Sequence, residues 1–264
     1  MAIGPDRATV DAVALLPRFP NSTTVPDGAT PAPVVHEANG LRLSIHPTGV
    51  ATLTPLPGAQ VHTGHIRAHL ATLPRGRVQR VTTSALSPRD TAVWVAAGFR
   101  TATRLVLLRA DLTRPMLPRS STRPASAPDA RLRPGRRREW PTLASVDNEA
   151  FAPQPGLGLG GLLDAVAVTP AARIRVAGVP PVGFVLAGHD VRCGYVQRLA
   201  VSPAVAGRGI GSALLADTIR WLQRRRATEV LVNTEEGNTR ALALYERFGF
   251  ARQPDGLVVL EWEP

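Results

Sequence analysis

The chain lacks lysine altogether and is poor in cysteine and aromatic residues. All 31 of its basic residues are arginines, Cys193 carries its one thiol, and aromatic residues make up 5% of the sequence. A single cysteine excludes an internal disulfide framework and a metal site built from cysteines. Because no aromatic residues interleave with the arginines in a stacking pattern, the composition argues against a nucleic-acid partner.

Long apolar runs are also missing. None approaches the ~20 residues of a membrane span, and no basic segment followed by an apolar one opens the sequence. We therefore expect a cytoplasmic protein that is not bound to a membrane. With 44% hydrophobic residues the chain can form two modest cores or one large one, and its net charge of +11 favours anionic ligands or partners.

A proline-rich stretch divides the chain. Residues 113–130 show no apolar periodicity, and such a stretch buries too little surface to offset its ordering entropy. We therefore predict two domains, residues 1–112 and 131–264, joined by an extended linker over 113–130. The arginines just after the linker are expected to form a solvated entry to the second domain. They are Arg131, Arg133, Arg136, Arg137 and Arg138.

The second domain shows alternating strand and helix patterns. Helices are predicted over 139–151, 209–226 and 239–248, and strands over 173–177, 182–187, 191–201, 229–234 and 257–262, the last closing the sheet. Cys193 is interpreted as a small buried residue at the start of its strand. Strands that alternate with helices at this spacing indicate a mixed α/β sandwich.

Two blocks near the C-terminus carry the chemistry. The first runs from Leu199-Ala-Val-Ser-Pro203 through Gly207-Arg-Gly-Ile-Gly-Ser212, which we call the glycine turn, into the apolar run Ala213-Leu-Leu215. A strand that passes through such a turn into a helix points several backbone N–H groups at one spot, where a diphosphate can bind. The second block is Asn238-Thr-Arg-Ala-Leu-Ala-Leu-Tyr245-Glu-Arg-Phe-Gly-Phe250.

Together, these blocks resemble the acyl-CoA site of the GCN5-related N-acetyltransferases, the GNAT superfamily. The resemblance implies a GNAT fold, in which helices flank a mixed central sheet, and acetyl-CoA as the cosubstrate, with no metal. One position departs from the pattern. GNAT proteins usually carry Gln or Arg three residues before the central glycine, where this chain has Ala206. The backbone donors of the glycine turn do not depend on that side chain.

The resemblance also implies which residues bind the cofactor. The backbone of Leu199 and Val201 is expected to pair with the pantetheine arm like an added strand, and the Val201 N–H to polarise the thioester carbonyl. Asn238 suits an N-cap as well as a cofactor contact, and Arg208 is as compatible with solvent as with phosphate. The predicted cofactor-binding residues are Leu199, Ala200, Val201, Gly207, Arg208, Gly209, Ile210, Gly211, Ser212, Asn238 and Tyr245.

Tyr245 is the predicted catalytic residue. Acyl transfer to an amine expels a thiolate that needs a proton, which a tyrosine at this position usually supplies in the family. The alternative is a packed aromatic ring without chemistry. For the base, many family members carry a glutamate on the strand before the Leu-x-Val-x-Pro segment, whereas residues 194–198 hold no carboxylate here. Tyr195, Glu235 or a water chain remain open, and an amine that binds neutral needs no strong base.

The first domain repeats part of the second. Aligned without a gap, residues 81–99 match residues 232–250, and residues 57–60 then lie opposite the glycine turn. Ser87 stands opposite Asn238, and Trp94 replaces Tyr245. Residues 34–111 therefore resemble a degenerate GNAT-like α/β domain, which makes this a tandem protein. The histidines at 62, 65 and 69 have the spacing of one helix face, but no fourth ligand is evident, and solvent-facing side chains are expected.

Two functions follow from these features. The first is an N-acetyltransferase that moves an acetyl group from acetyl-CoA to a primary amine by direct attack in a ternary complex. The second is a non-catalytic acyl-CoA-binding sensor, which the missing strand carboxylate leaves open. The helix and loop over residues 140–163 are expected to line the acceptor site. The sequence does not identify the acceptor, and it leaves a homodimer open.

Overall fold

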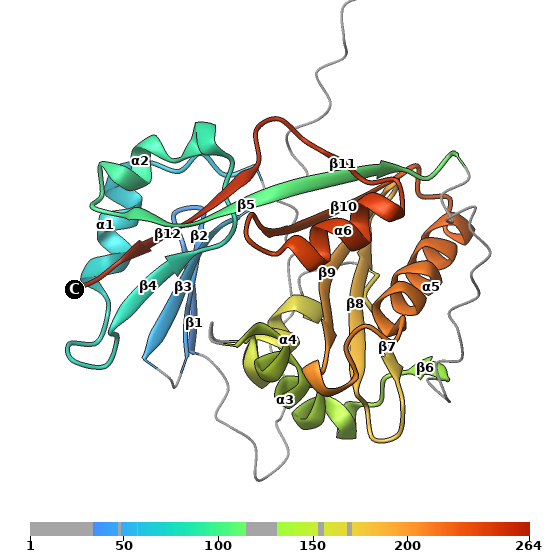
Figure 1. Cartoon of the computed structure of the whole chain (residues 1–264). Helices are drawn as coiled ribbons and strands as arrows, with labels where there is room; N and C mark the ends of the chain where they lie inside the picture. The colour runs from blue at the N-terminus through green and yellow to red at the C-terminus, as the bar shows by residue number, and fades with distance from the viewer. Residues whose placement is uncertain (1–33, 47–48, 57, 115–130, 153–155, 168–170) are drawn as a thin grey trace, which may run out of the picture. The chain divides into compact units, whose positions relative to one another are not determined.

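The structure is a computed structural model that describes residues 34–46, 49–56, 58–114, 131–152, 156–167 and 171–264 (Figure 1). It divides into two compact units. Unit 1 comprises residues up to Leu105 together with Asp255–Pro264, and unit 2 comprises Val106–Pro254. Nearly all of the linker expected over residues 113–130 lies outside the described residues. No helix within the described ranges is long and apolar enough to cross a membrane.

Unit 2 is built on a mixed sheet with the strand order β5-β10-β9-β8-β7-β6. The pairs β6–β7, β7–β8 and β8–β9 are antiparallel, whereas β9 and β10 are parallel. The short strand β11 pairs with the far end of β5. The strands are β5 (Arg100–Asp111), β6 (Leu132–Pro134), β7 (Arg173–Ala177), β8 (Gly183–His189), β9 (Cys193–Val201), β10 (Glu229–Glu235) and β11 (Ala251–Arg252).

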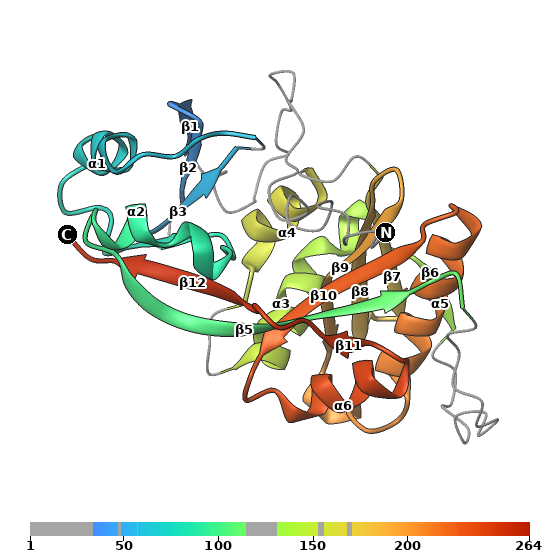
Figure 2. The same cartoon turned by 90° about the horizontal axis from the view of Figure 1, so that it is seen from above.

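Helices cover both faces of this sheet (Figures 1 and 2). Leu214, Leu215 and Ile219 of α5 are fully buried with Tyr245 and Phe248 of the α6 segment in one core on the first face. A separate core joins α3 and α4 to the other face of β8 and β9. The helices are α3 (Trp140–Phe151), α4 (Gly158–Ala167), α5 (Ile210–Arg224) and α6 (Thr239–Arg247), with 3-10 turns η3 (Arg137–Glu139) and η4 (Pro203–Val205).

Each element predicted within unit 2 is confirmed to within two residues at each end, but β5, β6, β11 and α4 were not predicted. The three-residue strand β6 is too short to leave a pattern, so it was not predicted. Helix α4 was not predicted either, because glycines at 158, 160 and 161 read as a loop. Burial of Leu162 in the α3 core stabilises this helix despite its glycines.

The strands of unit 1 have the order β1-β2-β3-β4-β12-β5, and β5 is shared with the strands of unit 2 in one continuous sheet. The core of unit 1 includes the fully buried Leu41, Leu53, Ile66, Trp94 and Leu260. Its elements are β1 (Val34–Ala38), β2 (Leu41–Ile45), β3 (Val50–Pro55), α1 (Thr63–Ala71), β4 (Arg80–Thr83), η2 (Pro88–Asp90), α2 (Ala92–Val95), the first part of β5, and β12 (Leu257–Trp262).

The two segments aligned in the sequence adopt the same local structure. Strand β4 lies parallel to β3, as β10 lies parallel to β9. Trp94 and Phe99 meet with ring centroids 5.2 Å apart, and Tyr245 and Phe250 with centroids 5.5 Å apart. In both segments the later aromatic residue donates its N–H to the carbonyl of the earlier one over 3.1 Å. A glycine with positive φ, Gly98 or Gly249, closes each turn. The internal repeat is therefore visible in the fold.

The last strand of the chain, β12, belongs to unit 1, whereas the end of β5, which follows unit 1 in the sequence, belongs to unit 2. We call this arrangement the exchange of final strands. β12 pairs with β4 and β5 within unit 1, so the expectation that residues 257–262 close the sheet of the second domain was wrong. The reason is that β5 is twelve residues long and continues past Leu105 into the place beside β10. The unit boundaries consequently differ from the domain limits of 112 and 131 expected from the sequence.

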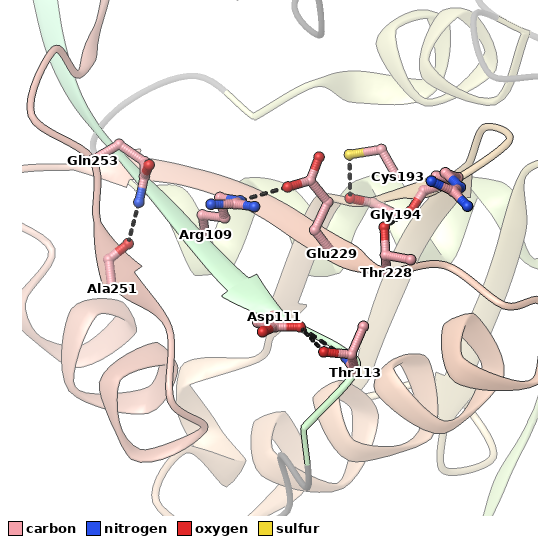
Figure 3. Close-up of polar contacts among 10 residues, drawn as sticks. Arg109, Asp111, Thr113, Cys193, Gly194, Thr228, Glu229, Ala251 and Gln253 are labelled. Carbon is pink, nitrogen blue, oxygen red and sulfur yellow. Dashed lines mark hydrogen bonds and ion pairs between the residues drawn. The ribbon is translucent and has the colours of Figure 1, made fainter. Parts of the chain in front are cut away.

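Figure 3 shows the end of β5 with its neighbours β10 and β11, and β9 on the other side of β10. The Arg109 guanidinium donates to the Glu229 carboxylate over 2.5 Å, and the Thr113 N–H and hydroxyl both donate to Asp111. Burial raises the pKa of the half-buried Cys193 thiol to about 11. The thiol therefore stays protonated at neutral pH, in line with a structural residue.

Candidate active site

The strands β9 and β10 separate before they end. They pair only from Cys193–Glu229 to Val196–Val232, although β9 continues to Val201 and β10 to Glu235. On its other side β9 stays paired with β8 as far as Val201. The edge of β9 that faces β10 is therefore open over its last five residues. We call this segment, residues 197–201, the open edge.

The N–H groups of Leu199 and Val201 point to that open side. The Ser202 N–H donates over 2.9 Å to the carbonyl of Val182, the residue just before β8. Because successive N–H groups of a strand alternate in direction, those of Val201 and Leu199 face away from β8. The open edge thus supplies the backbone donors that the resemblance assigns to the pantetheine arm and to the thioester carbonyl.

A β-bulge at Gln197 sets which side chains flank this edge. Leu186 pairs with Arg198, whereas Ala187 pairs with Val196, so Gln197 is the extra residue. A bulge shifts the alternation of side chains by one position. Val196 before the bulge and Val201 after it both pack against the α5 core, and Ala200 joins the α3 core. Arg198 therefore points to the α3 face.

The glycine turn leads from β9 to an uncapped helix N-terminus. Gly207 and Gly209 have φ values of +80° and +81°, and no side chain caps α5 at Gly209. The first N–H groups of an α-helix have no acceptor within the helix. A Cβ at Gly211 would lie 3.5 Å from Leu244 and 3.9 Å from Val201, so the turn adjoins the open edge. Free donors at a helix N-terminus are suited to binding an anion, and these lie beside the open edge.

Two arginines add positive charge at this end of α5. Arg208 is exposed within the turn itself. Arg247 of α6 donates to the Ser212 hydroxyl over 3.4 Å, which brings its guanidinium to the first turn of α5. The predicted anion-binding segment over residues 207–212 therefore carries backbone donors, a hydroxyl and cationic side chains together. Ala206 ends the η4 turn with its N–H bonded to Pro203, and its short side chain leaves the turn open.

Asn238 and Tyr245 lie on α6. The Asn238 side chain accepts a hydrogen bond from the Ala241 N–H over 3.1 Å, which confirms it as the N-cap. Tyr245 is only 4% exposed in the α5 core. Burial raises the pKa of Tyr245 well above its ordinary value, and the charge of Arg198 opposes part of that rise. The hydroxyl is therefore protonated at neutral pH, as a general acid must be.

The structure separates the candidate bases. Burial raises the pKa of Tyr195 far above its ordinary value. A base must be deprotonated, so this environment argues against Tyr195. Glu235 is half-buried at the end of β10, beyond the last residue pair that joins β10 to β9.

A buried ion pair beside the open edge was not foreseen from the sequence. The Arg198 guanidinium donates to both carboxylate oxygens of Asp147, over 2.6 Å from Nε and 2.9 Å from Nη2. Asp147 is fully buried in α3 and also accepts from the Leu157 N–H over 2.7 Å. The sequence did indicate that Asp147 is buried, because it lies in the same helical stripe as the apolar Leu143 and Val146.

The histidines of unit 1 do not form a metal site. Across the described part of the chain, no group of three or more His, Cys, Asp and Glu side chains could hold a metal ion. His62 and His65 touch edge to face, with ring centroids 5.2 Å apart. His69 is buried with its Nε2 2.9 Å from the Ala38 carbonyl, so the expectation that it faces solvent was wrong.

Comparisons with known proteins agree with this geometry. Residues 147–250 match the model of the Acetyltransferase (GNAT) family. The mycothiol acetyltransferase of Salinispora arenicola is 35% identical over 184 residues, which cover 62% of this chain and 57% of that protein. The mycothiol acetyltransferase of Acidimicrobium ferrooxidans is 31% identical over 196 residues, covering 62% and 60%. The chain thus spans less than two thirds of the length of these relatives.

Solved structures share the fold. A tandem GNAT protein from the clavulanic acid biosynthesis pathway superposes with a TM-score of 0.59 at 16% identity, over 89% of this chain and 84% of the other. A GCN5-related N-acetyltransferase from Sphaerobacter thermophilus gives a TM-score of 0.54 at 18% identity, over 85% and 76%. Residues 147–250 therefore match the Acetyltransferase (GNAT) family, and the chain has the fold of a tandem GNAT protein.

Proposed function

We propose that this protein is an N-acetyltransferase that moves an acetyl group from acetyl-CoA to a primary amine. The observation that carries the proposal is the open edge of β9 directly beside the uncapped N-terminus of α5. The open edge offers backbone N–H donors that can pair with an extended arm, and the helix N-terminus offers donors for an anion. An extended arm that ends in a diphosphate requires both.

Acetyl-CoA fits the residues present. The N–H groups from Gly207 to Ser212 hold the pyrophosphate, with Arg208 and Arg247 adding charge. The backbone of Leu199, Ala200 and Val201 pairs with the pantetheine arm, since the bulge frees this edge from β10. Asn238, which already caps α6, lies at the cofactor edge together with Tyr245. No metal takes part in this proposal.

The chemistry is direct attack of the amine on the thioester carbonyl. The Val201 N–H donates to the carbonyl oxygen and stabilises the charge that develops there. Tyr245 supplies a proton to the departing thiolate, for which its protonated hydroxyl is suited. An acceptor that binds as the neutral amine needs no strong base, and Glu235 or a water chain accepts the remaining proton.

The names of the relatives suggest the first acceptor to test. Several are mycothiol acetyltransferases, so the amine of a mycothiol precursor is the leading candidate for the acceptor. We further propose that unit 1 binds no cofactor, because Ser87 and Trp94 stand where unit 2 has Asn238 and Tyr245. The cytoplasmic location and a homodimer remain predictions.

Thiol release from acetyl-CoA tests the proposal directly. The full chain is incubated with acetyl-CoA and a panel of primary amines that includes the mycothiol precursor, and free CoA is measured over time. Turnover with at least one amine supports the enzyme. Binding of acetyl-CoA without thiol release from any amine favours the sensor instead, for which the absence of a carboxylate in residues 194–198 is the supporting observation.

A further inference from the structure

Strand β7 and the end of helix α5 carry a group of arginines that the proposed chemistry does not use. Arg173 and Arg175 alternate with Ile174 along β7, and both contact Asp217 of α5, so their side chains point to the face that α5 covers. Arg224 is the last residue of α5, and Arg225 is its C-cap. We call Arg173, Arg175, Arg224 and Arg225 the arginine cluster.

The Trp221 ring brings two of these guanidinium groups together. The guanidinium carbon of Arg173 lies 5.4 Å from the centre of the ring, and that of Arg225 lies 5.8 Å from it. Both distances are within the ~6 Å range of cation–π contacts. Trp221 follows Asp217 by one helical turn, so the ring and the carboxylate lie on one side of α5. The arginine cluster is therefore compact and is organised around one indole ring.

One carboxylate does not balance the charge of the arginine cluster. Asp217 Oδ2 lies 3.0 Å from Nη1 of Arg173 and 3.2 Å from Nε of Arg175, so four positive charges share one negative charge. Burial lowers the pKa of Arg173. Asp217 opposes this effect, whereas the positive charges of the other three arginines add to it. Because like charges held close together repel each other, a bound anion would relieve this repulsion.

The dipole of α5 does not account for the whole arginine cluster. Cations at the C-terminus of a helix are stabilised by a partial charge of about −0.5, which explains Arg224 and Arg225. Arg173 and Arg175 lie on β7 instead, and their side chains are only 23% and 15% exposed. Removing a cation from water without a full partner destabilises a fold. The excess of positive charge therefore favours a ligand over a purely structural role.

The anion that suits the arginine cluster is a phosphate monoester. It carries nearly two negative charges at neutral pH, and its oxygens match the forked N–H groups of a guanidinium. A carboxylate brings one charge, and Asp217 already supplies one to the cluster. A nucleic-acid strand needs an extended basic track and free aromatic faces. This cluster surrounds a single indole ring, which two guanidinium groups already contact.

We propose that the arginine cluster binds the phosphate group of a small phosphorylated metabolite. This site is separate from the one proposed for the pyrophosphate of acetyl-CoA. Helix α5 runs from Ile210 to Arg224, so the glycine turn at its start lies about 20 Å along the helix axis from its last residue. The site concerns a second ligand and does not depend on acetyltransferase activity.

Calorimetric titration of the full chain tests the proposal. The protein is first saturated with CoA, which fills the glycine turn, and is then titrated with ethyl phosphate, inorganic phosphate or propionate at constant ionic strength. We expect one phosphate site per chain. Ethyl phosphate should bind about 10-fold more tightly than propionate or better, because it brings a second charge and more accepting oxygens.

Two double variants with the same loss of charge identify the site. R173Q/R225Q removes the two guanidinium groups at Trp221 and leaves Arg175 paired with Asp217. Its affinity for ethyl phosphate should fall by about 10- to 100-fold, the effect of losing hydrogen bonds to a charged group. The matched control, R75Q/R77Q, changes two exposed residues of unit 1 and leaves the cluster intact, so the affinity should stay nearly unchanged.

Folding of the variants is checked by circular dichroism and thermal melts. If R173Q/R225Q does not fold, R224Q/R225Q takes its place, because both of its positions are exposed and neither contacts Asp217 in an ion pair within the described part of the chain. The same loss of affinity for ethyl phosphate is expected there.

Each other result overturns the proposal. Equal affinity for propionate and ethyl phosphate would mean that the cluster attracts any anion, and an equal loss in the control variant would mean that net charge alone drives binding. Tighter binding of a phosphoserine peptide than of ethyl phosphate would place the phosphate on a protein. Binding of a short DNA duplex without binding of ethyl phosphate would identify a nucleic-acid surface. Failure to bind CoA would refute the proposed function instead, and the two double variants would still decide whether the cluster binds phosphate.

Discussion

Gly211 is the position where a single side chain should separate cofactor binding from folding. A Cβ placed there meets only ordinary van der Waals contacts, at 3.5 Å from Leu244 and 3.9 Å from Val201. Gly211 lies in the first turn of α5, where an acidic side chain is compatible with the helix dipole. Gly211→Glu should therefore fold, while its carboxylate takes the place that the diphosphate needs.

The expected loss follows from the charges. Two like charges about 4 Å apart repel by ~1 kcal/mol in water and by ~4 kcal/mol at the effective dielectric constant of a protein surface. With two phosphate groups facing the carboxylate, the loss of binding free energy should be at least ~2 kcal/mol. The affinity for CoA then falls about 30-fold or more. Isothermal titration calorimetry measures this change directly.

Two matched variants make the result decisive. Gly211→Ala adds a methyl group that fits the observed space and should bind CoA nearly as the wild type does. Gly211→Gln has the size of Glu without its charge, so the difference between them isolates the electrostatic part. A folded Gly211→Glu protein that binds CoA with unchanged affinity would refute the placement of the pyrophosphate over the glycine turn.

Three other measurements address the remaining parts of the proposal. Tyr245→Phe should lower turnover with a competent amine by about 10²- to 10⁴-fold with far less effect on CoA affinity; a loss below about threefold with chemistry rate-limiting would rule out the acid. Titration with acetyl-CoA should give one site per chain, whereas two equivalent sites would contradict a degenerate unit 1. Leu260→Ala should destabilise unit 1 by about 2–5 kcal/mol in denaturant unfolding, because Leu260 is buried in its core. If the variant unfolds like the wild type, β12 does not belong to that core.

Local signals explain why most of unit 2 could be predicted. The apolar stripe of α5 and the glycine turn before it fix a helix start, and Asn238 before α6 is a capping residue by type. These features depend on neighbours in sequence. The aligned segments over residues 81–99 and 232–250 were likewise found because their turns need a glycine at the same place, Gly98 or Gly249.

Features that depend on distant neighbours were out of reach. The residue pattern of Leu257–Trp262 indicates a strand but does not indicate which strands it pairs with. Its pairing with β4 could therefore not be predicted from the sequence. The bulge at Gln197 has no residue signature, yet it decides that Arg198 faces α3. The contact between Arg198 and Asp147, 51 positions apart, needed both the bulge and the packing of α3 on the sheet.

The exchange of final strands has a consequence for synthesis on the ribosome. Unit 1 cannot complete its sheet when its own residues up to Leu105 emerge, because Asp255–Pro264, which include β12, are still to be made. All of Val106–Pro254 is translated in between, which takes about 7 to 30 s at ~5–20 residues per second. During that time the edge of β4 has no partner strand and is open to pairing with other chains. The charged side chains of Arg80 and Arg100, which later pair with Glu261, are placed to discourage such association until β12 arrives.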